Sequence, residues 1–212
     1  MIRPNEKPQP PDADAALDLL RTQLRIGMER AAAMLSGFLQ PRQQFRIRLS
    51  AAQAEPPGGP QQAQAGVCLT LEGGVSGAVL LLFSAESAGR LAGLLLRQDA
   101  PPDLAEAPLR STLKEVGNIF ASGVLASLDD RLQLRALPLP PTFLTGSRQE
   151  LERHWRDSCQ APGAFALQAR LECRSAQGVL LEGAVFFQVA AQSLQQIVAS
   201  GRLTGVAPPP SP

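Results

Sequence analysis

The chain has 212 residues, of which 44% are hydrophobic, so it can bury one substantial core or the cores of two small repeated halves. Its 20 basic and 19 acidic residues give a net charge of +1, which argues against a nucleic-acid or anionic-membrane partner. Aromatic residues make up 4% and tyrosine is absent, so a base-stacking surface is not expected either.

The two ends of the chain have the composition of disordered tails. Residues 1–14 are polar and proline-rich, with no apolar stretch of the kind found in a secretory signal, and residues 204–212 contain four prolines. Residues 51–64 likewise have the composition of a flexible loop. We therefore expect an ordered region from residue 15 to residue 203 in a cytoplasmic protein.

The first half predicts the order helix, strand, hairpin, helix. Apolar residues recur at helical spacing over residues 15–39, and residues 44–50 alternate apolar side chains with arginines, as a strand does. Residues 66–83 form two apolar runs around Gly73 and Gly74, which predicts a β-hairpin. A second helix is expected over residues 86–97.

The most apolar stretch, from Val79 to Leu96, is 18 residues long and invites comparison with a membrane span. Glu86 and Arg90 interrupt it, and its first part has strand character. We expect a buried strand followed by a helix, and no membrane insertion.

The second half repeats this order, with a helix over about 108–128, a strand within 131–139, a hairpin within 164–189 and a helix within 191–203. The tripeptide Gly77-Ala78-Val79 recurs 106 residues later, and Leu20, Ile26, Ala33 and Leu35 recur 93 residues later. The sequence thus predicts an α/β fold whose mostly antiparallel sheet packs against helices. We expect one domain over 15–203, made of two pseudo-repeats at about 15–98 and 104–203.

Cysteine and histidine offer no metal site. Cys68, Cys159 and Cys173 are far apart in the sequence, and His154 is the only histidine. The segment around His154 predicts a short solvated helix, and Trp155 is expected to pack that helix onto the body of the protein.

The predicted helix at 108–128 carries a polar line. Positions 111, 115, 118 and 122 follow one face at 3.6 residues per turn, so the line consists of Ser111, Glu115, Asn118 and Ser122. Apolar residues occupy the opposite face, as in a helix that packs on a core. Glu115 and Asn118 are therefore expected to point outward together.

Together with Pro141, this line reads S-x3-E-x2-N-x22-P, and it resembles the active-site signature of the CheC/CheX/FliY family of response-regulator phosphatases. The family has a CheC-like fold, a tandem repeat of helix, strand, hairpin and helix, and the likeness extends over about residues 15–203. The resemblance implies hydrolysis of the aspartyl phosphate on a CheY-like receiver, with Glu115 and Asn118 as the catalytic residues. Ser111, Ser122 and Pro141 are expected at the partner contact, although Pro141 has an equally good explanation as a loop proline that shapes the strand end. The chain would need no cofactor of its own, because the receiver would supply Mg²⁺.

Family members with two sites carry Glu-x-x-Asn in both halves. Ninety-three residues before the intact motif stand Asp18, Thr22, Arg25 and Arg48. Asp18 fits the first position of the pattern, but Thr22 and Arg25 cannot replace the carboxylate and the amide. We expect one intact site and one degenerate site. The alternative functions are a module that binds a receiver, a flagellar-switch component or a CheD-like deamidase without hydrolysis, and a purely structural dimer.

Overall fold

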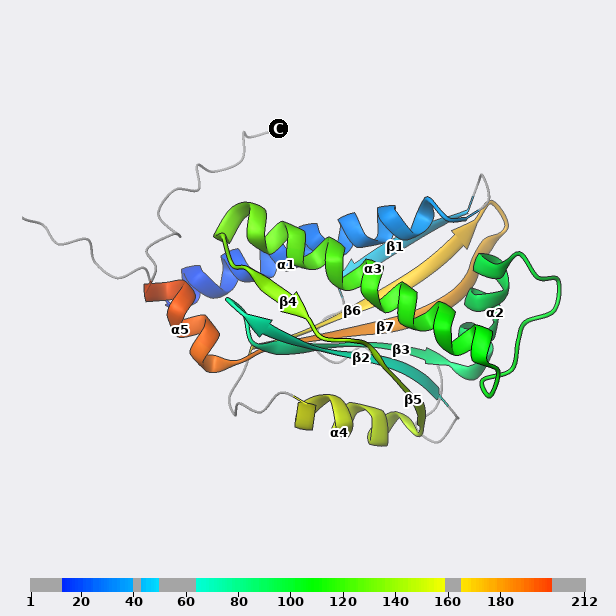
Figure 1. Cartoon of the computed structure of the whole chain (residues 1–212). Coiled ribbons are helices and arrows are strands. Elements are labelled where there is room, and N and C mark those ends of the chain that lie inside the picture. The colour runs from blue at the N-terminus through cyan, green and yellow to red at the C-terminus, as the bar shows by residue number, and fades with distance from the viewer. Residues whose placement is uncertain (1–12, 40–42, 50–63, 159–164, 200–212) are drawn as a thin grey trace, which may run out of the picture.

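The computed structural model describes residues 13–39, 43–49, 64–158 and 165–199, and its core is a single antiparallel sheet (Figure 1). The order of the strands across the sheet is β1-β6-β7-β3-β2-β4, and β5 pairs with β2 next to β4. The strands are β1 (Gln44–Leu49), β2 (Gln64–Gly73), β3 (Gly77–Ser84), β4 (Ala136–Pro138), β5 (Thr142–Gly146), β6 (Phe165–Ser175) and β7 (Gly178–Val189).

Strands of each half pair with strands of the other half. The strand β1 pairs with β6 of the second half, whereas β4 and β5 pair with β2 of the first half. The two hairpins meet in the middle of the sheet, where the β3–β7 ladder runs from Gly77 opposite Val189 to Phe83 opposite Gly183. The two halves therefore share one sheet and one core.

Both hairpin turns need glycine. Gly73 has a φ of +97° and Gly178 a φ of +129°, a region that residues with a Cβ rarely adopt. The turn expected near Gly73 and Gly74 is confirmed, as is the hairpin of the second half.

Four helices are α1 (Ala13–Ser36), α2 (Ala85–Leu96), α3 (Ala107–Leu132) and α5 (Ala191–Ala199). Their apolar side chains and the inward side chains of the sheet form the main core, which includes Leu24, Phe83 and Phe120. In Figure 1, α1 and α3 lie side by side over the sheet, with α2 and α5 at its two ends. The expected α/β class is confirmed.

The helix α4 (Arg148–Ser158) covers the opposite face of the sheet (Figure 1). Ser147 and Glu150 cap its start reciprocally, because the Ser147 N–H donates to Glu150 Oε2 and the Glu150 N–H donates to Ser147 Oγ. Trp155 is buried and its Nε1 donates to the Ala78 carbonyl at 3.2 Å. The expected packing role of Trp155 is confirmed, and α4 is solvated on one side only.

The boundaries of several elements differ from expectation. Helix α1 ends three residues earlier than predicted, because Gly37, Phe38 and Leu39 form single turns after Ser36. Helix α3 extends one turn further than predicted and buries Leu132, so the following strand is only Ala136–Pro138. The strand β5 was not predicted.

Some predictions lie outside the described residues. These are the two tails apart from residues 13 and 14, the loop at 51–64 apart from Gln64, the end of the last helix from residue 200, and Cys159. The boundaries of the two pseudo-repeats stay predictions. No helix among the described residues is long and apolar enough to cross a membrane, and the cytoplasmic location stays a prediction.

Candidate functional site

The helix α3 presents its polar line to solvent and its apolar face to the core. Leu113, Val116, Phe120, Val124 and Leu128 are all at most 1% exposed. On the other face Ser111, Glu115 and Ser122 are exposed, and Asn118 is half-buried. The amphipathic pattern of the sequence therefore orients this helix as expected.

Gly117 fixes how deeply α3 sits on the sheet. A Cβ at this position would lie 2.7 Å from Val67 Cγ1 and 3.2 Å from Leu69 Cδ1, both on β2. Real Cβ atoms do not approach other atoms as closely as 2.7 Å, so only glycine allows this crossing. The next residue, Asn118, is thus held at the point where the helix touches the sheet.

Asn118 and Glu115 are bonded to each other. Asn118 Nδ2 donates to Glu115 Oε2 at 3.3 Å, across one turn of α3. The distance is at the long end for such a bond, so little free energy is needed to exchange it for another contact. Because the amide uses its N–H group here, its carbonyl oxygen Oδ1 is left to accept a bond from another molecule.

Pro141 lies beside the part of β2 against which Gly117 packs. Pro138 pairs with Leu71 and Thr142 pairs with Cys68, so Pro141 falls within the stretch that runs between these two pairings. Pro141 and the middle of α3 therefore both lie next to the same stretch of β2. Ser111 and Ser122 lie two turns before and one turn after Asn118 on the same helix.

The corresponding surface of α1 has no such pair. From Leu17 onward, where the structure describes burial, each buried residue of α1 has a buried counterpart 93 residues later in α3, which supports this spacing between the halves. Thr22 and Arg25, at the positions of Glu115 and Asn118, are exposed. The Thr22 hydroxyl donates to the Asp18 carbonyl, and Arg25 pairs with Glu29 at 3.0 Å. These side chains make local helix contacts and offer no carboxamide.

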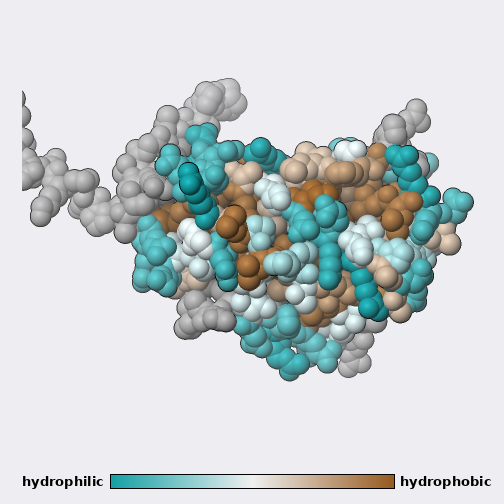
Figure 2. Space-filling view, in the orientation of Figure 1, coloured by the Kyte–Doolittle hydropathy of each residue, from teal (hydrophilic) through white to brown (hydrophobic). Residues whose placement is uncertain are grey.

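Sequence reasoning missed an apolar groove beside Glu115. It has a volume of about 390 Å³ and lies among the C-terminal ends of α1 and α2 and the middle of α3. Phe38 and Leu96 line it and are 58% and 37% exposed. In Figure 2, brown patches gather where the ends of α1 and α2 meet α3, and again over β4. Only tertiary contacts bring these segments together, so no sequence signal reveals the groove.

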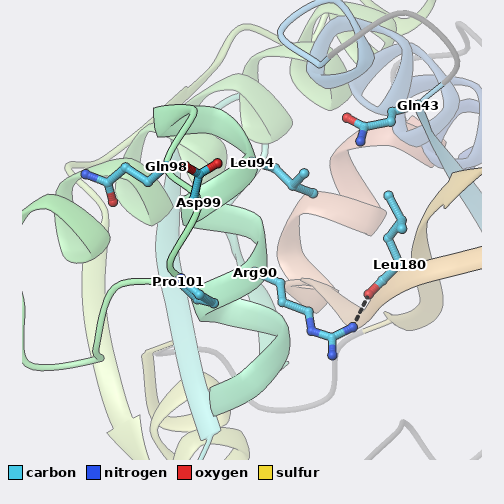
Figure 3. Close-up of a pocket in the computed structure, with 8 residues that line it drawn as sticks. Gln43, Arg90, Leu94, Gln98, Asp99, Pro101 and Leu180 are labelled. Carbon is cyan, nitrogen blue, oxygen red and sulfur yellow. Dashed lines mark hydrogen bonds between the residues drawn. The ribbon is translucent and has the colours of Figure 1, made fainter.

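A second pocket, of about 210 Å³, lies between α2, the loop that follows it and β7 (Figure 3). Arg90, one of the two charged residues in its lining, is already engaged, because Nη1 donates to the Leu180 carbonyl at 3.2 Å and Nη2 lies 2.6 Å from Glu86 Oε1. Asp99, Gln43 and Gln98 also line the pocket, and Gln43 Oε1 is buried without a hydrogen-bond partner among the described residues.

The structure disfavours nucleophilic chemistry at the two cysteines that it describes. Cys68 and Cys173 are buried, and burial raises the pKa of the Cys68 thiol and raises that of Cys173 to about 11. Neither thiol forms a reactive thiolate near neutral pH. Within the described part of the chain, no three His, Cys, Asp or Glu side chains gather as a metal site.

Solved structures share this architecture. FliY from Thermotoga maritima is similar with a TM-score of 0.64 and 15% identity, over 87% of this chain and 94% of that one. The chain has the CheC-like fold. FliM from H. pylori is also similar, with a TM-score of 0.58 in a complex with SpeE and 0.56 in a complex with FliG. These two matches have 11% and 10% identity and cover 90% and 85% of this chain and 97% of each FliM chain.

The resemblance to FliY proteins noted in the sequence is thus confirmed for the CheC-like fold. No family model matches the sequence, and no curated protein matches it. At these identities the likeness concerns the arrangement of helices and strands. The roles of Glu115 and Asn118 within the CheC-like fold stay predictions.

Proposed function

We propose that this chain hydrolyses the aspartyl phosphate of a CheY-like response regulator. The observation that carries the proposal is the Asn118–Glu115 pair on the outer face of α3. The close contact of Gly117 with β2 sets the distance of this part of the helix from the sheet. The pair and Pro141 match the motif of the phosphatases in the CheC/CheX/FliY family, and FliY shares the fold.

Asn118 would act by positioning water. A carboxamide does not titrate near neutral pH, so it cannot remove a proton as a general base. Its Oδ1 can accept a hydrogen bond from a water molecule and hold that molecule in line with the phosphorus atom. The water oxygen forms a bond to phosphorus as the bond from phosphorus to the aspartate oxygen breaks. The products are a free aspartate and inorganic phosphate, and the proton of the water passes to phosphate and solvent.

Glu115 would fix the docking pose. Its exposed carboxylate accepts one bond from Asn118 and retains lone pairs for a cation. The lysine that contacts the phosphoryl group in a receiver is the cation that the family resemblance assigns to it. Mg²⁺ would come from the receiver and would neutralise charge on the phosphoryl oxygens, so this chain would need no cofactor of its own.

The other residues of the motif would border the contact. Ser111 and Ser122 are exposed on α3 before and after the pair, where their hydroxyls can donate to or accept from a docked surface. Pro141 is half-buried beside β2, which favours a role in shaping the strand end.

The test measures the lifetime of phosphate on purified receivers with and without catalytic amounts of the chain. We expect the wild-type chain to shorten that lifetime for at least one receiver, and Asn118→Ala to remove most of the effect. Gln192→Ala, which removes an exposed amide from α5, is the matched control and should leave the rate unchanged. Equal rates for wild type and Asn118→Ala would refute the proposal.

A second candidate is a binding module without hydrolysis. It is favoured by the similarity to FliM, whose structures were solved with FliG and with SpeE as partners. The chain would then bind a receiver, a flagellar-switch component or a CheD-like deamidase without hydrolysing a phosphate. This candidate predicts tight binding with no change in phosphate lifetime, so the same assay separates the two functions.

A further inference from the structure

We infer that the apolar groove next to Glu115 is the docking site for one helix of the receiver. The groove lies among α1, α2 and α3, and its occupant would be an amphipathic helix with an apolar anchor and an acidic residue near its N-terminus. The inference deepens the proposed function, on which it rests for the identity of the partner.

Most of the residues that line the groove are apolar, and Arg97, Thr112 and Glu115 are the polar ones. Leu35 and Val116 are buried beneath it, while Phe38 and Leu96 stand at its edge with more than a third of their surface in water. Covering such side chains with a partner is favourable by roughly 25 cal/mol per Å² of apolar surface. The volume of about 390 Å³ is enough for apolar side chains to enter.

The charges at the rim define the partner further. Arg97 lines the groove and ends α2 in the left-handed conformation, with a φ of 55°. It forms no ion pair with an acidic side chain that the structure describes, whereas Arg90, two turns earlier, is paired with Glu86. Glu115, on the same rim, is bonded only to Asn118 among the described residues. The groove is therefore complementary to an acidic residue near Arg97 and to a cation near Glu115.

A receiver has the element that fits this pattern. In doubly wound α/β folds such as that of CheY, the functional crevice lies at the carboxyl ends of the strands, where the N-termini of helices meet it. Acidic residues are favoured in the first turn of a helix. If Asn118 enters that crevice, the first turns of a neighbouring receiver helix are the segment that comes next to Glu115 and the groove.

The experiment measures the Kd of each variant for purified receivers loaded with Mg²⁺ and beryllofluoride, a stable mimic of the phosphoryl group. Phe38→Ser and Arg97→Glu should each raise the Kd about tenfold, and a lysine in place of the acidic residue on the receiver helix should restore binding to Arg97→Glu. Val179→Ser and Arg153→Glu change an exposed valine and an exposed arginine on other elements, and should leave the Kd unchanged. Urea unfolding of every variant checks that the fold is retained.

Turnover separates this inference from the proposed function. We expect Phe38→Ser to raise the receiver concentration at half-maximal rate and to leave the maximal rate unchanged. If Asn118→Ala abolishes turnover while Phe38→Ser and Arg97→Glu bind as the wild type does, the groove is not the docking site and the phosphatase proposal stands. If both groove variants weaken binding but the wild-type chain never shortens the phosphate lifetime, docking is supported and the phosphatase proposal fails.

Discussion

Gly117 and Val67 touch where α3 crosses β2, and a single methyl group at Gly117 would lie 2.7 Å from Val67 Cγ1. Both residues are buried, and the β-branched valine has little rotamer freedom with which to move aside. The contact sets the height of α3 above the sheet, and therefore the position of Asn118 next to it.

Gly117→Ala should destabilise the fold and reduce turnover. Overpacking costs about 1–3 kcal/mol, and the gain in helix propensity of about 1 kcal/mol offsets only part of it. Gly93→Ala is the matched control, because a Cβ in that helical position would meet its nearest neighbour at an ordinary 3.6 Å. We expect urea unfolding to show a loss of stability for Gly117→Ala and none for Gly93→Ala. A fully stable and active Gly117→Ala would show that α3 can rise without consequence.

Glu115→Gln should weaken the binding of the receiver more than it lowers the maximal rate of hydrolysis. The change keeps the bond from Asn118 and removes the charge that would meet a receiver cation. The receiver concentration at half-maximal rate should rise about tenfold, and the difference from wild type should shrink as salt is added, because salt screens the ion pair. Steady-state rates at two ionic strengths measure both effects. Asp157→Asn, on the exposed side of α4, is the control, and an equal response of the two variants would contradict a specific role of Glu115.

Trp155→Ala should lower the free energy of unfolding by about 3–5 kcal/mol. The indole is 6% exposed, packs at 5.5 Å from the ring of Phe186 and donates to the Ala78 carbonyl. His154→Ala, one residue earlier and exposed, should change stability by less than about 0.5 kcal/mol. Chemical denaturation of the two variants makes the comparison. Similar losses for both would mean that α4 does not depend on the indole contact.

Because of Cys173, the free energy of unfolding should decrease at high pH. Burial raises the pKa of its thiol from 9.0 to about 11, so the folded chain holds the proton more tightly than the unfolded chain. Below pH 9 the Cys173 thiol is protonated in both the folded and the unfolded chain, so its full contribution to the free energy of unfolding is present. Between pH 9 and 11 the unfolded thiol loses its proton first, so stability decreases with rising pH, by on the order of 1 kcal/mol.

Urea midpoints at pH 8 and pH 10.5 measure this loss for the wild type and for Cys173→Ala. The variant is expected to be less stable at both values because of the cavity, but to lose less between them. An identical loss in the variant would assign the pH dependence to other groups.

The sequence by itself determined the type of most elements and the face that α3 turns to water. Helical spacing of Leu113, Val116 and Phe120 orients that helix, because apolar side chains leave water whatever they pack against. Gly73 and Gly74 predicted the turn of the first hairpin, and the 93- and 106-residue repeats predicted the element order, since these signals are local or internal to the chain.

The tertiary structure decided what local patterns cannot encode. It extended α3 to Leu132, where a further turn finds a buried position, and it added β5, which forms because β2 offers it a partner. It also paired β1, β4 and β5 with strands of the other half, and it brought Phe38, Leu96 and Glu115 to one groove from three segments that are far apart in the sequence. Such contacts join residues far apart in sequence, and their free energy depends on the whole core, so they are fixed only when the chain has folded.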